Sequence, residues 1–237
     1  MEERKPNLPL ATRSTRGSSE RKPRMKRFEH IYSERHQDAG WNVVQAATLL
    51  AEAKARRCSS LVIYAAVEMR MAIEQLVFTI ILLAKEKIDD ATLQECRKKD
   101  GLFRVLEEVS PRYSMKCRFS NVLGSFYPEI PKVAEWDVKS LRRYYTALSD
   151  LCHSQLVIQG MAAAPEKWNA KIELVEKVYE FLAARMRKGT SVLSFKGATS
   201  HAIDLWEKYS KGEITLEDVR ERFALVKPLL DSRRIQT

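Results

Sequence analysis

The feature that most constrains the fold is a long apolar run over residues 59–87, SSLVIYAAVEMRMAIEQLVFTIILLAKEK, which predicts one continuous helix. At 1.5 Å per residue this helix extends roughly 40 Å, which is long enough to cross a bilayer. Glu68, Arg70 and Glu74 lie in its middle, however, and each charge would cost roughly 2.5–3.5 kcal/mol at the bilayer centre. We therefore expect a central buried helix of a soluble bundle, and no membrane contact.

The rest of the chain also follows a helical period, and no stretch alternates convincingly at period two. Residues 111–136 hold Pro111, Gly124, Pro128 and Pro131, which predicts a long aromatic-rich connection after a helix that ends at Ser110-Pro111. Gly101 is expected to cap the C-terminus of the helix before it. The sequence therefore predicts an all-α, up-and-down helical bundle. The other predicted helices cover residues 41–57, after Gly40, and 91–100, 102–109, 138–159, 166–188, 199–210 and 216–230.

The net charge of +10 is unevenly distributed along the 237 residues. Residues 1–30 carry nine basic and four acidic side chains, so half of the excess lies in about an eighth of the chain. This segment holds few large apolar groups, which is typical of a disordered basic arm. The predicted organisation is an arm over residues 1–30, a bundle core over 31–188 and a C-terminal helical extension over 189–237 that packs on the core.

Several chemical classes are excluded or disfavoured by composition. The eight glycines are too far apart for a dinucleotide fingerprint or a Walker phosphate loop, since both need clustered glycines. The four cysteines form no C-x-x-C pair, which argues against a zinc site or a disulfide framework and favours free thiols. The start of the chain lacks an apolar signal segment. We expect no metal, no cofactor and a cytoplasmic location.

The first candidate site lies within the apolar run. Arg70 and Glu74 are four residues apart, so their side chains share one face of the helix. A buried charge must be paired or hydrogen-bonded, which predicts that Arg70 contacts a carboxylate. An internal salt bridge that fixes the helix register is favoured here over a catalytic role.

The second candidate site lies in the segment YYTALSDLCH, residues 144–153. Asp150 and His153 are three residues apart on one helical face, and Ser149 and His153 are four apart. A carboxylate beside an imidazole orients the ring and raises its pKa, which suits general acid–base chemistry. A histidine with one carboxylate neighbour is more often a packing residue, so both interpretations stay open.

The two segments together resemble the HEPN-type helical superfamily. The resemblance rests on a helix reading L/M-R-x-A-I/L-E and a second helix, some seventy residues later, reading Y-x-x-L-S-D-x-x-H. It covers roughly residues 41–188. The matching positions are Arg70, Glu74, Tyr145, Leu148, Ser149, Asp150 and His153.

The resemblance implies a four- or five-helix bundle, commonly dimeric, of the kind found in toxin–antitoxin, antiphage and RNA-processing systems. Nuclease members of the superfamily carry R-x(4–6)-H and cut RNA without metal. Here nine residues separate Arg143 from His153, and eight separate Arg27 from His36, so the nuclease motif is absent.

Three functional hypotheses follow. The leading one is a HEPN-like protein that acts mainly through protein–protein contacts, with a protein partner or as a homo-oligomer, in an antiphage or toxin–antitoxin system. It leaves open a further contact with nucleic acid. The first alternative is a metal-independent RNase that uses His153 with Arg70 or Arg143, beside Glu74 and Asp150. The second is an accessory protein whose arm binds RNA or DNA. The candidate phosphate-binding residues are Arg21, Lys22, Arg24, Lys26, Arg27, Arg142 and Arg143.

Overall fold

The computed structural model describes residues 38–85, 88–130, 132–152, 160–161, 164–187 and 199–234. The chain divides into two units, residues 1–36 and residues 37–237. The predicted basic arm over residues 1–30 lies outside the described residues, and everything below concerns the second unit.

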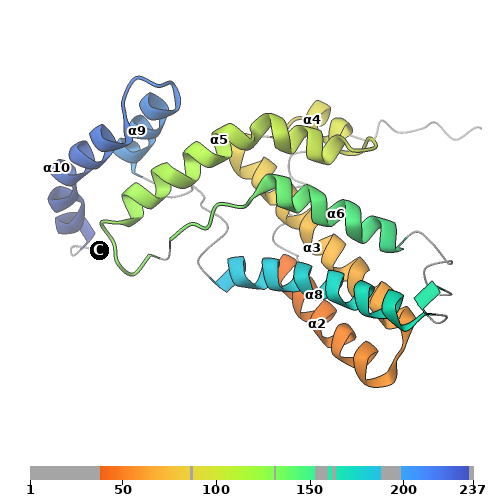
Figure 1. The fold of residues 1–237 in the computed structure, drawn as a ribbon. Coiled ribbons are helices and arrows are strands. Elements are labelled where there is room, and N and C mark those ends of the chain that lie inside the picture. Colours follow the sequence, from red (N-terminus) through yellow and green to blue (C-terminus); the bar gives the residue numbers. More distant parts are fainter. Residues whose placement is uncertain are drawn as a thin grey trace, which may run out of the picture. The chain divides into compact units, whose positions relative to one another are not determined.

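The predicted all-α fold is confirmed for the described part of the chain, which forms eight helices and no β-strand (Figure 1). The helices are α2 (Ala39–Arg56), α3 (Ser59–Lys85), α4 (Asp90–Cys96), α5 (Gly101–Gly124), α6 (Val138–Cys152), α8 (Pro165–Arg187), α9 (Ser200–Ser210) and α10 (Leu216–Arg234).

The long apolar run forms α3, which is the central helix of the bundle as predicted. It contacts α2, α5, α6 and α8, and eleven of its residues from Val62 to Ala84 are buried. Among the described helices, none combines the length and the apolarity that a membrane span requires. The side chains of α3 form the main apolar core with inward residues of its four neighbours.

The ends of several helices follow the capping signals in the sequence. The Asp89 carboxylate accepts the Thr92 amide at 2.7 Å, and Thr215 and Asp218 exchange the reciprocal bonds of a capping box at 2.8 and 3.2 Å. The start of α2 was predicted wrongly, because the helix begins at Ala39 and includes Gly40. The Asp38 carboxylate caps it by accepting the Trp41 amide at 2.8 Å.

The prediction that a helix ends at Ser110-Pro111 is wrong, because α5 continues through Pro111 to Gly124. Pro111 has no N–H to donate to the carbonyl of Glu107, four residues earlier. The Ser110 hydroxyl donates to that same carbonyl at 3.0 Å. This bond satisfies the Glu107 carbonyl, which Pro111 leaves without its helical donor. The helix can therefore continue past the proline.

The predicted role of Gly101 is also wrong. The helix before it ends at Cys96, and Gly101 is the first residue of α5. A Cβ atom at Gly101 would lie 1.8 Å from the carbonyl oxygen of Glu95. Glycine is therefore required because two backbone segments meet there, and the preceding Asp100 takes the left-handed conformation, with φ of 59°.

The connection between α5 and α6 is shorter than predicted, and side chains of α5 hold it. The Asn121 carboxamide donates to the Val133 carbonyl at 3.1 Å and accepts the Val133 amide at 2.8 Å. The Tyr113 hydroxyl accepts the Trp136 amide at 3.2 Å. These bonds satisfy backbone groups of a segment that has no helical partners of its own.

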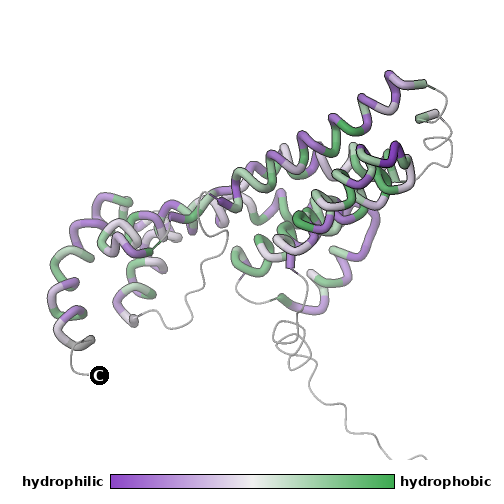
Figure 2. Tube along the Cα trace, turned by 90° about the horizontal axis from the view of Figure 1, so that it is seen from below, coloured by the Kyte–Doolittle hydropathy of each residue, from purple (hydrophilic) through white to green (hydrophobic). Residues whose placement is uncertain are grey.

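The C-terminal half of α5 carries a second, smaller apolar cluster that it shares with α9 and α10. The ring of Phe119 lies 5.4 Å from that of Trp206, and Phe126 lies 5.2 Å from Phe223. Along the same helix, Lys116 is buried and donates to the Leu83 carbonyl near the end of α3 at 2.8 Å. Figure 2 shows hydrophobic and hydrophilic residues interleaved along the helices, as expected for amphipathic elements.

The bond from Ser110 to Glu107 predicts a non-additive pair of substitutions. Pro111→Ala should stabilise the protein by about 1–3 kcal/mol, since a proline inside a helix costs up to about 3 kcal/mol. Ser110→Ala should cost about 0.5–1 kcal/mol in the wild-type background. It should cost close to nothing in the Pro111→Ala background, because the restored backbone amide would then reach the Glu107 carbonyl. Urea unfolding of the wild type, the two single variants and the double variant measures this coupling. An equal cost in both backgrounds would refute the compensation.

Candidate functional site

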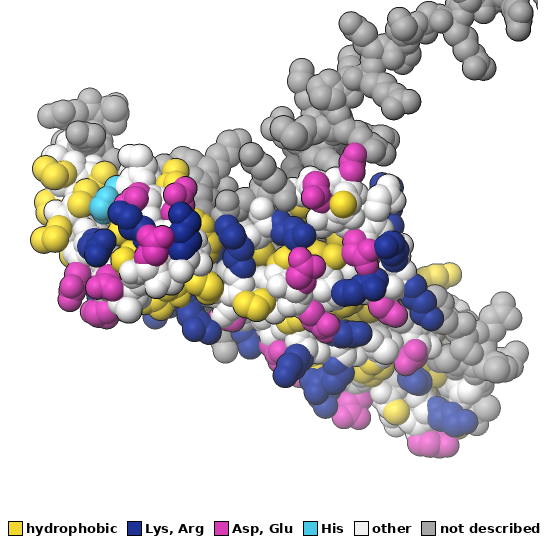
Figure 3. Space-filling view, turned by 90° about the horizontal axis from the view of Figure 1, so that it is seen from above, with side chains coloured by type: hydrophobic (Ala, Val, Ile, Leu, Met, Phe, Trp, Pro, Cys, Tyr) yellow, Lys and Arg dark blue, Asp and Glu magenta, His cyan; other side chains and the backbone are white. Residues whose placement is uncertain are grey.

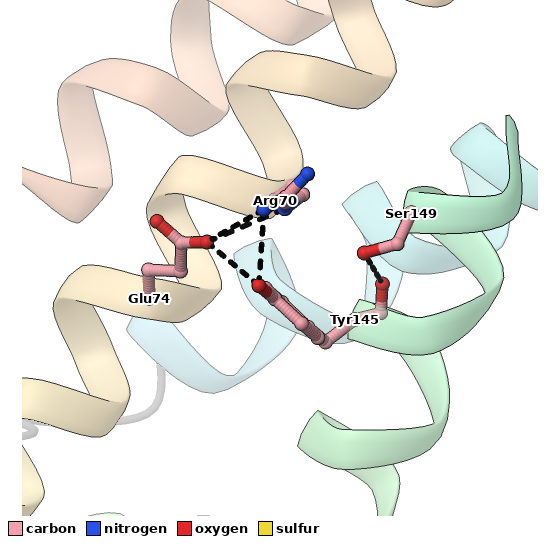
Figure 4. Close-up of polar contacts among 4 residues, drawn as sticks. All are labelled: Arg70, Glu74, Tyr145 and Ser149. Carbon is pink, nitrogen blue, oxygen red and sulfur yellow. Dashed lines mark hydrogen bonds and ion pairs between the residues drawn. The ribbon is translucent and has the colours of Figure 1, made fainter. Parts of the chain in front are cut away.

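Three polar side chains meet where α3 and α6 lie side by side, and we call them the Arg70–Glu74–Tyr145 cluster (Figure 4). Arg70 and Glu74 are one turn apart on α3, and the Arg70 Nε donates to Glu74 Oε1 at 3.3 Å. The hydroxyl of Tyr145, on α6, donates to the same oxygen at 2.9 Å and accepts from Arg70 Nη2 at 3.1 Å. The predicted contact between Arg70 and Glu74 is present, and Tyr145 joins it to a second helix.

The cluster lies at the edge of the apolar core, which corrects the expectation of an internal salt bridge. The Arg70 and Glu74 side chains are 29% and 38% exposed. The Tyr145 ring packs on Phe103 of α5 with ring centres 4.9 Å apart, and the Arg70 guanidinium lies 5.0 Å from the centre of the Tyr145 ring. The cluster is therefore only partly covered by the neighbouring helices.

The contacts within the cluster shift two pKa values. Burial raises the pKa of the Tyr145 phenol, and the hydrogen bond to Glu74 and its negative charge raise it further. Burial alone would lower the pKa of Arg70, but the bonds to Tyr145 and the charge of Glu74 outweigh it and raise this pKa. At neutral pH the cluster therefore holds a protonated phenol and a guanidinium cation.

Two further side chains of α6, those of Ser149 and Cys152, lie near the cluster. The Ser149 hydroxyl donates to the carbonyl of Tyr145 at 2.9 Å, so its proton is engaged within its own helix (Figure 4). Burial raises the pKa of the Cys152 thiol, although the positive charge of Arg70 opposes the rise. Within the described part of the chain, neither group has a base beside it, and the thiol pKa is raised and not lowered as in an activated nucleophile.

One side of the Arg70 guanidinium remains available for a ligand. Its Nε and Nη2 are engaged by Glu74 and Tyr145, while Nη1 has no hydrogen-bond partner among the described residues. The second carboxylate oxygen of Glu74, Oε2, likewise has none within the described part of the chain. The cluster therefore offers one cationic donor and one anionic acceptor, which point away from each other at its two ends (Figure 4).

The other predicted site residues that the structure describes, Asp150, Arg142 and Arg143, are not brought into this cluster. Asp150 is exposed on α6 and makes no hydrogen bond or ion pair with the described residues. Arg142 forms an ion pair with Glu107 of α5, and the Arg143 guanidinium lies 4.9 Å from the centre of the neighbouring Tyr144 ring. The residues that lie outside the described part are His153 and the arm residues Arg21, Lys22, Arg24, Lys26 and Arg27.

No cluster of metal-ligand type is formed in the part of the chain that the structure describes, where no three His, Cys, Asp or Glu side chains converge. The cysteines are all free, and Cys117 is buried beside Tyr113. Burial raises the pKa of the Cys117 thiol to about 11.

A row of exposed apolar side chains borders the cluster, and the helical period alone did not predict it. Tyr64, Val67 and Met71 are 58%, 37% and 38% exposed, and we call them the outward face of α3. Their spacing of three and four residues places them on one side of the helix. The spacing can be read from the sequence. However, α3 is apolar on all sides, and the sequence does not show which of these sides lacks a neighbouring helix.

Comparisons of the chain with protein-family models, with curated proteins and with solved structures find no match.

The raised pKa of Tyr145 predicts an alkaline loss of stability. A folded-state pKa above the unfolded value of about 10 contributes stability that is complete below that pH and is lost above it. Tyr145→Phe should therefore cost about 1 kcal/mol at pH 7, through the lost hydrogen bonds, and progressively less as the pH rises above about 10.

Urea unfolding of both proteins between pH 7 and pH 11 measures this effect. Tyr64→Phe is the matched control, because the Tyr64 ring is exposed and should leave both stability and its pH dependence unchanged. A difference between wild type and Tyr145→Phe that stays constant across this range would contradict the assignment.

Proposed function

We propose that the chain is a HEPN-like helical protein that acts through contact with a protein partner, which binds the outward face of α3 beside the Arg70–Glu74–Tyr145 cluster. The observation that carries this proposal is the exposure of Tyr64, Val67 and Met71 on the helix that forms the centre of the bundle. An apolar row on such a helix is expected where a further element completes the packing.

The composition of this surface supports a protein ligand. Tyrosine, methionine and arginine are enriched in protein interfaces, and a few well-packed anchors of this kind supply most of the binding energy. The free Nη1 of Arg70 and Oε2 of Glu74 add one donor and one acceptor at the border of the apolar row, neither being engaged by a described residue. Such polar groups fix the orientation of a partner that the apolar side chains hold.

The biological setting is proposed from the resemblance alone. HEPN-type modules recur in antiphage, toxin–antitoxin and RNA-processing systems, and the all-α fold supports an assignment to this group. A shared fold does not by itself determine function, so the partner surface carries the proposal and the resemblance supplies the setting.

A photo-crosslinking experiment tests the partner surface. The photoreactive residue p-benzoylphenylalanine replaces Tyr64 in the full chain, made in the cells that naturally produce it, and replaces Glu173, exposed on α8, as the matched control. We expect a protein adduct from position 64 only. We also expect Met71→Lys to reduce its yield at least tenfold, because a cation is placed in the apolar contact. Equal adducts from both positions, or none from position 64, would contradict the proposal.

A second candidate function is metal-independent RNA cleavage with His153 and Arg70. Its supporting observation is that the guanidinium of Arg70 lies within electrostatic reach of Cys152, the residue before His153. In this scheme His153 transfers the proton, and the guanidinium stabilises negative charge that develops on the phosphoryl group. The positive charge that Arg70 keeps at neutral pH suits the second role.

The two candidates differ in one measurement. The partner-binding function predicts that structured RNA, incubated with the protein and a chelator, stays intact. The nuclease function predicts cleavage that falls at least a hundredfold in both His153→Ala and Arg70→Lys, since the second variant keeps the charge and loses the guanidinium geometry. Cleavage that persists unchanged in both variants would exclude this site as its source.

Nucleic-acid binding by a folded surface has less support. On the face of the molecule in Figure 3, basic and acidic side chains are interspersed instead of forming a basic patch. Arg142 is engaged by Glu107, which reduces its availability for phosphate. The hypothesis of a phosphate-binding arm concerns residues outside the described part of the chain.

A further inference from the structure

The side of α2 that points away from the core carries a second apolar row, separate from the outward face of α3. Its members recur at alternating spacings of three and four residues, and all are exposed. The row lies on the opposite side of the helix from its buried residues Val43, Ala46, Leu50 and Ala53. We call it the α2 seam, and it consists of Trp41, Val44, Thr48, Ala51 and Ala55.

The spacing and exposure of the α2 seam are those of a helix that lacks its coiled-coil partner. Alternation of three and four residues is the heptad pattern that aligns one helix along another. Trp41 is 48% exposed and Val44 is 59% exposed, although both are large apolar residues. A helix that is apolar on two opposite sides is expected to have neighbours on both, and only one side of α2 has them in the described structure.

The single polar member of the α2 seam is already satisfied. The Thr48 hydroxyl donates to the carbonyl of Val44 at 3.1 Å within the helix. A partner that covers Thr48 would therefore meet its methyl group and would bury no unpaired donor, so the usual cost of covering a polar side chain does not arise.

We propose that the α2 seam pairs with the α2 seam of a second copy of this chain, with the two helices antiparallel and Thr48 close to the two-fold axis. The side chains of the seam are large at its N-terminal end, with Trp41 and Val44, and small at its C-terminal end, with Ala51 and Ala55. An antiparallel pair places the large end of each helix on the small end of the other. A parallel pair would place the bulky Trp41 side chains together and leave space between the alanines.

The charges at the two ends of α2 agree with this direction. Asp38 caps the N-terminal end, and the exposed Arg57 follows the C-terminal end, where Arg56 is paired with Glu52 of its own helix at 2.7 Å. The antiparallel pair brings the acidic end of one helix to the basic end of the other, whereas a parallel pair would bring like charges together. The same interface is used by both copies, as a two-fold axis requires.

The size of the interface determines the expected affinity. The contact follows one helix of 18 residues, about 27 Å long at 1.5 Å per residue. A standard stable interface buries about 1,600 Å² in total, usually from several elements, so a single helix pair should give a weak dimer with Kd in the micromolar range. The inference concerns a surface separate from the outward face of α3, so either proposal can hold without the other.

Sedimentation equilibrium of the full chain, from about 1 to 500 µM, tests the interface. We expect the mass to rise towards twice that of the monomer, and Thr48→Glu to remain monomeric because it places two carboxylates face to face. Thr146→Glu, the same change at an exposed position of α6, should dimerise as the wild type does. The proposal is overturned if the wild type is monomeric at every concentration. This is the result expected if another protein, or another segment of the same chain, covers the seam. The proposal is equally overturned if Thr48→Glu dimerises normally.

Disulfide trapping tests the direction of pairing. In a background with Cys58, Cys96 and Cys152 replaced by serine, Thr48→Cys should give a covalent dimer on mild oxidation, because the two positions meet at the axis. Trp41→Cys should not, since the two copies of position 41 lie about 21 Å apart, far beyond the roughly 7 Å limit between Cα atoms of a disulfide. Efficient trapping at position 41 and none at position 48 would overturn the antiparallel arrangement.

Discussion

The burial of α3 is the constraint on which the rest of the structure depends. Four helices pack around it, so its side chains must be apolar in several directions at once, and each large apolar side chain removed from water contributes about 1.5–3 kcal/mol. A helix with this requirement carries more apolar surface than its neighbours cover. The exposure of Tyr64, Val67 and Met71 follows from this excess.

The Arg70–Glu74–Tyr145 cluster gives a largely apolar bundle a specific alignment. Apolar contacts tolerate sliding of one helix along another, whereas a hydroxyl that both donates to a carboxylate and accepts from a guanidinium fits only one register. Its position at the border of the core lowers the desolvation cost that a fully buried ion pair would incur. It also leaves Nη1 of Arg70 and Oε2 of Glu74 without a partner among the described residues, so the groups that align the bundle can also meet a ligand.

The sequence was sufficient for features that depend on neighbouring residues and insufficient for those that depend on distant ones. Helical periods were predicted correctly, and the caps at Asp89 and Thr215 are equally local, because these interactions span three or four residues. The end of α5 was predicted wrongly because the Ser110 hydroxyl replaces the hydrogen bond that Pro111 cannot donate. The role of Gly101 was predicted wrongly because the requirement for glycine comes from the approach of the Glu95 carbonyl. Periodicity shared by Arg70 and Glu74 predicted their contact. It could not show that Tyr145, 71 residues beyond Glu74, would join them, or which apolar sides would lack a neighbour.

The continuity of α5 through Pro111 has a consequence for how the protein unfolds. The helix extends about 36 Å, its first half belongs to the main apolar cluster, and its second half belongs to the cluster with α9 and α10. Tyr113 and Cys117, which follow Pro111, also belong to the main cluster, so the two clusters overlap along the second half of the helix. A single hydrogen-bonded rod that enters both clusters ties their unfolding free energies together, so that two separate cores melt as one cooperative unit.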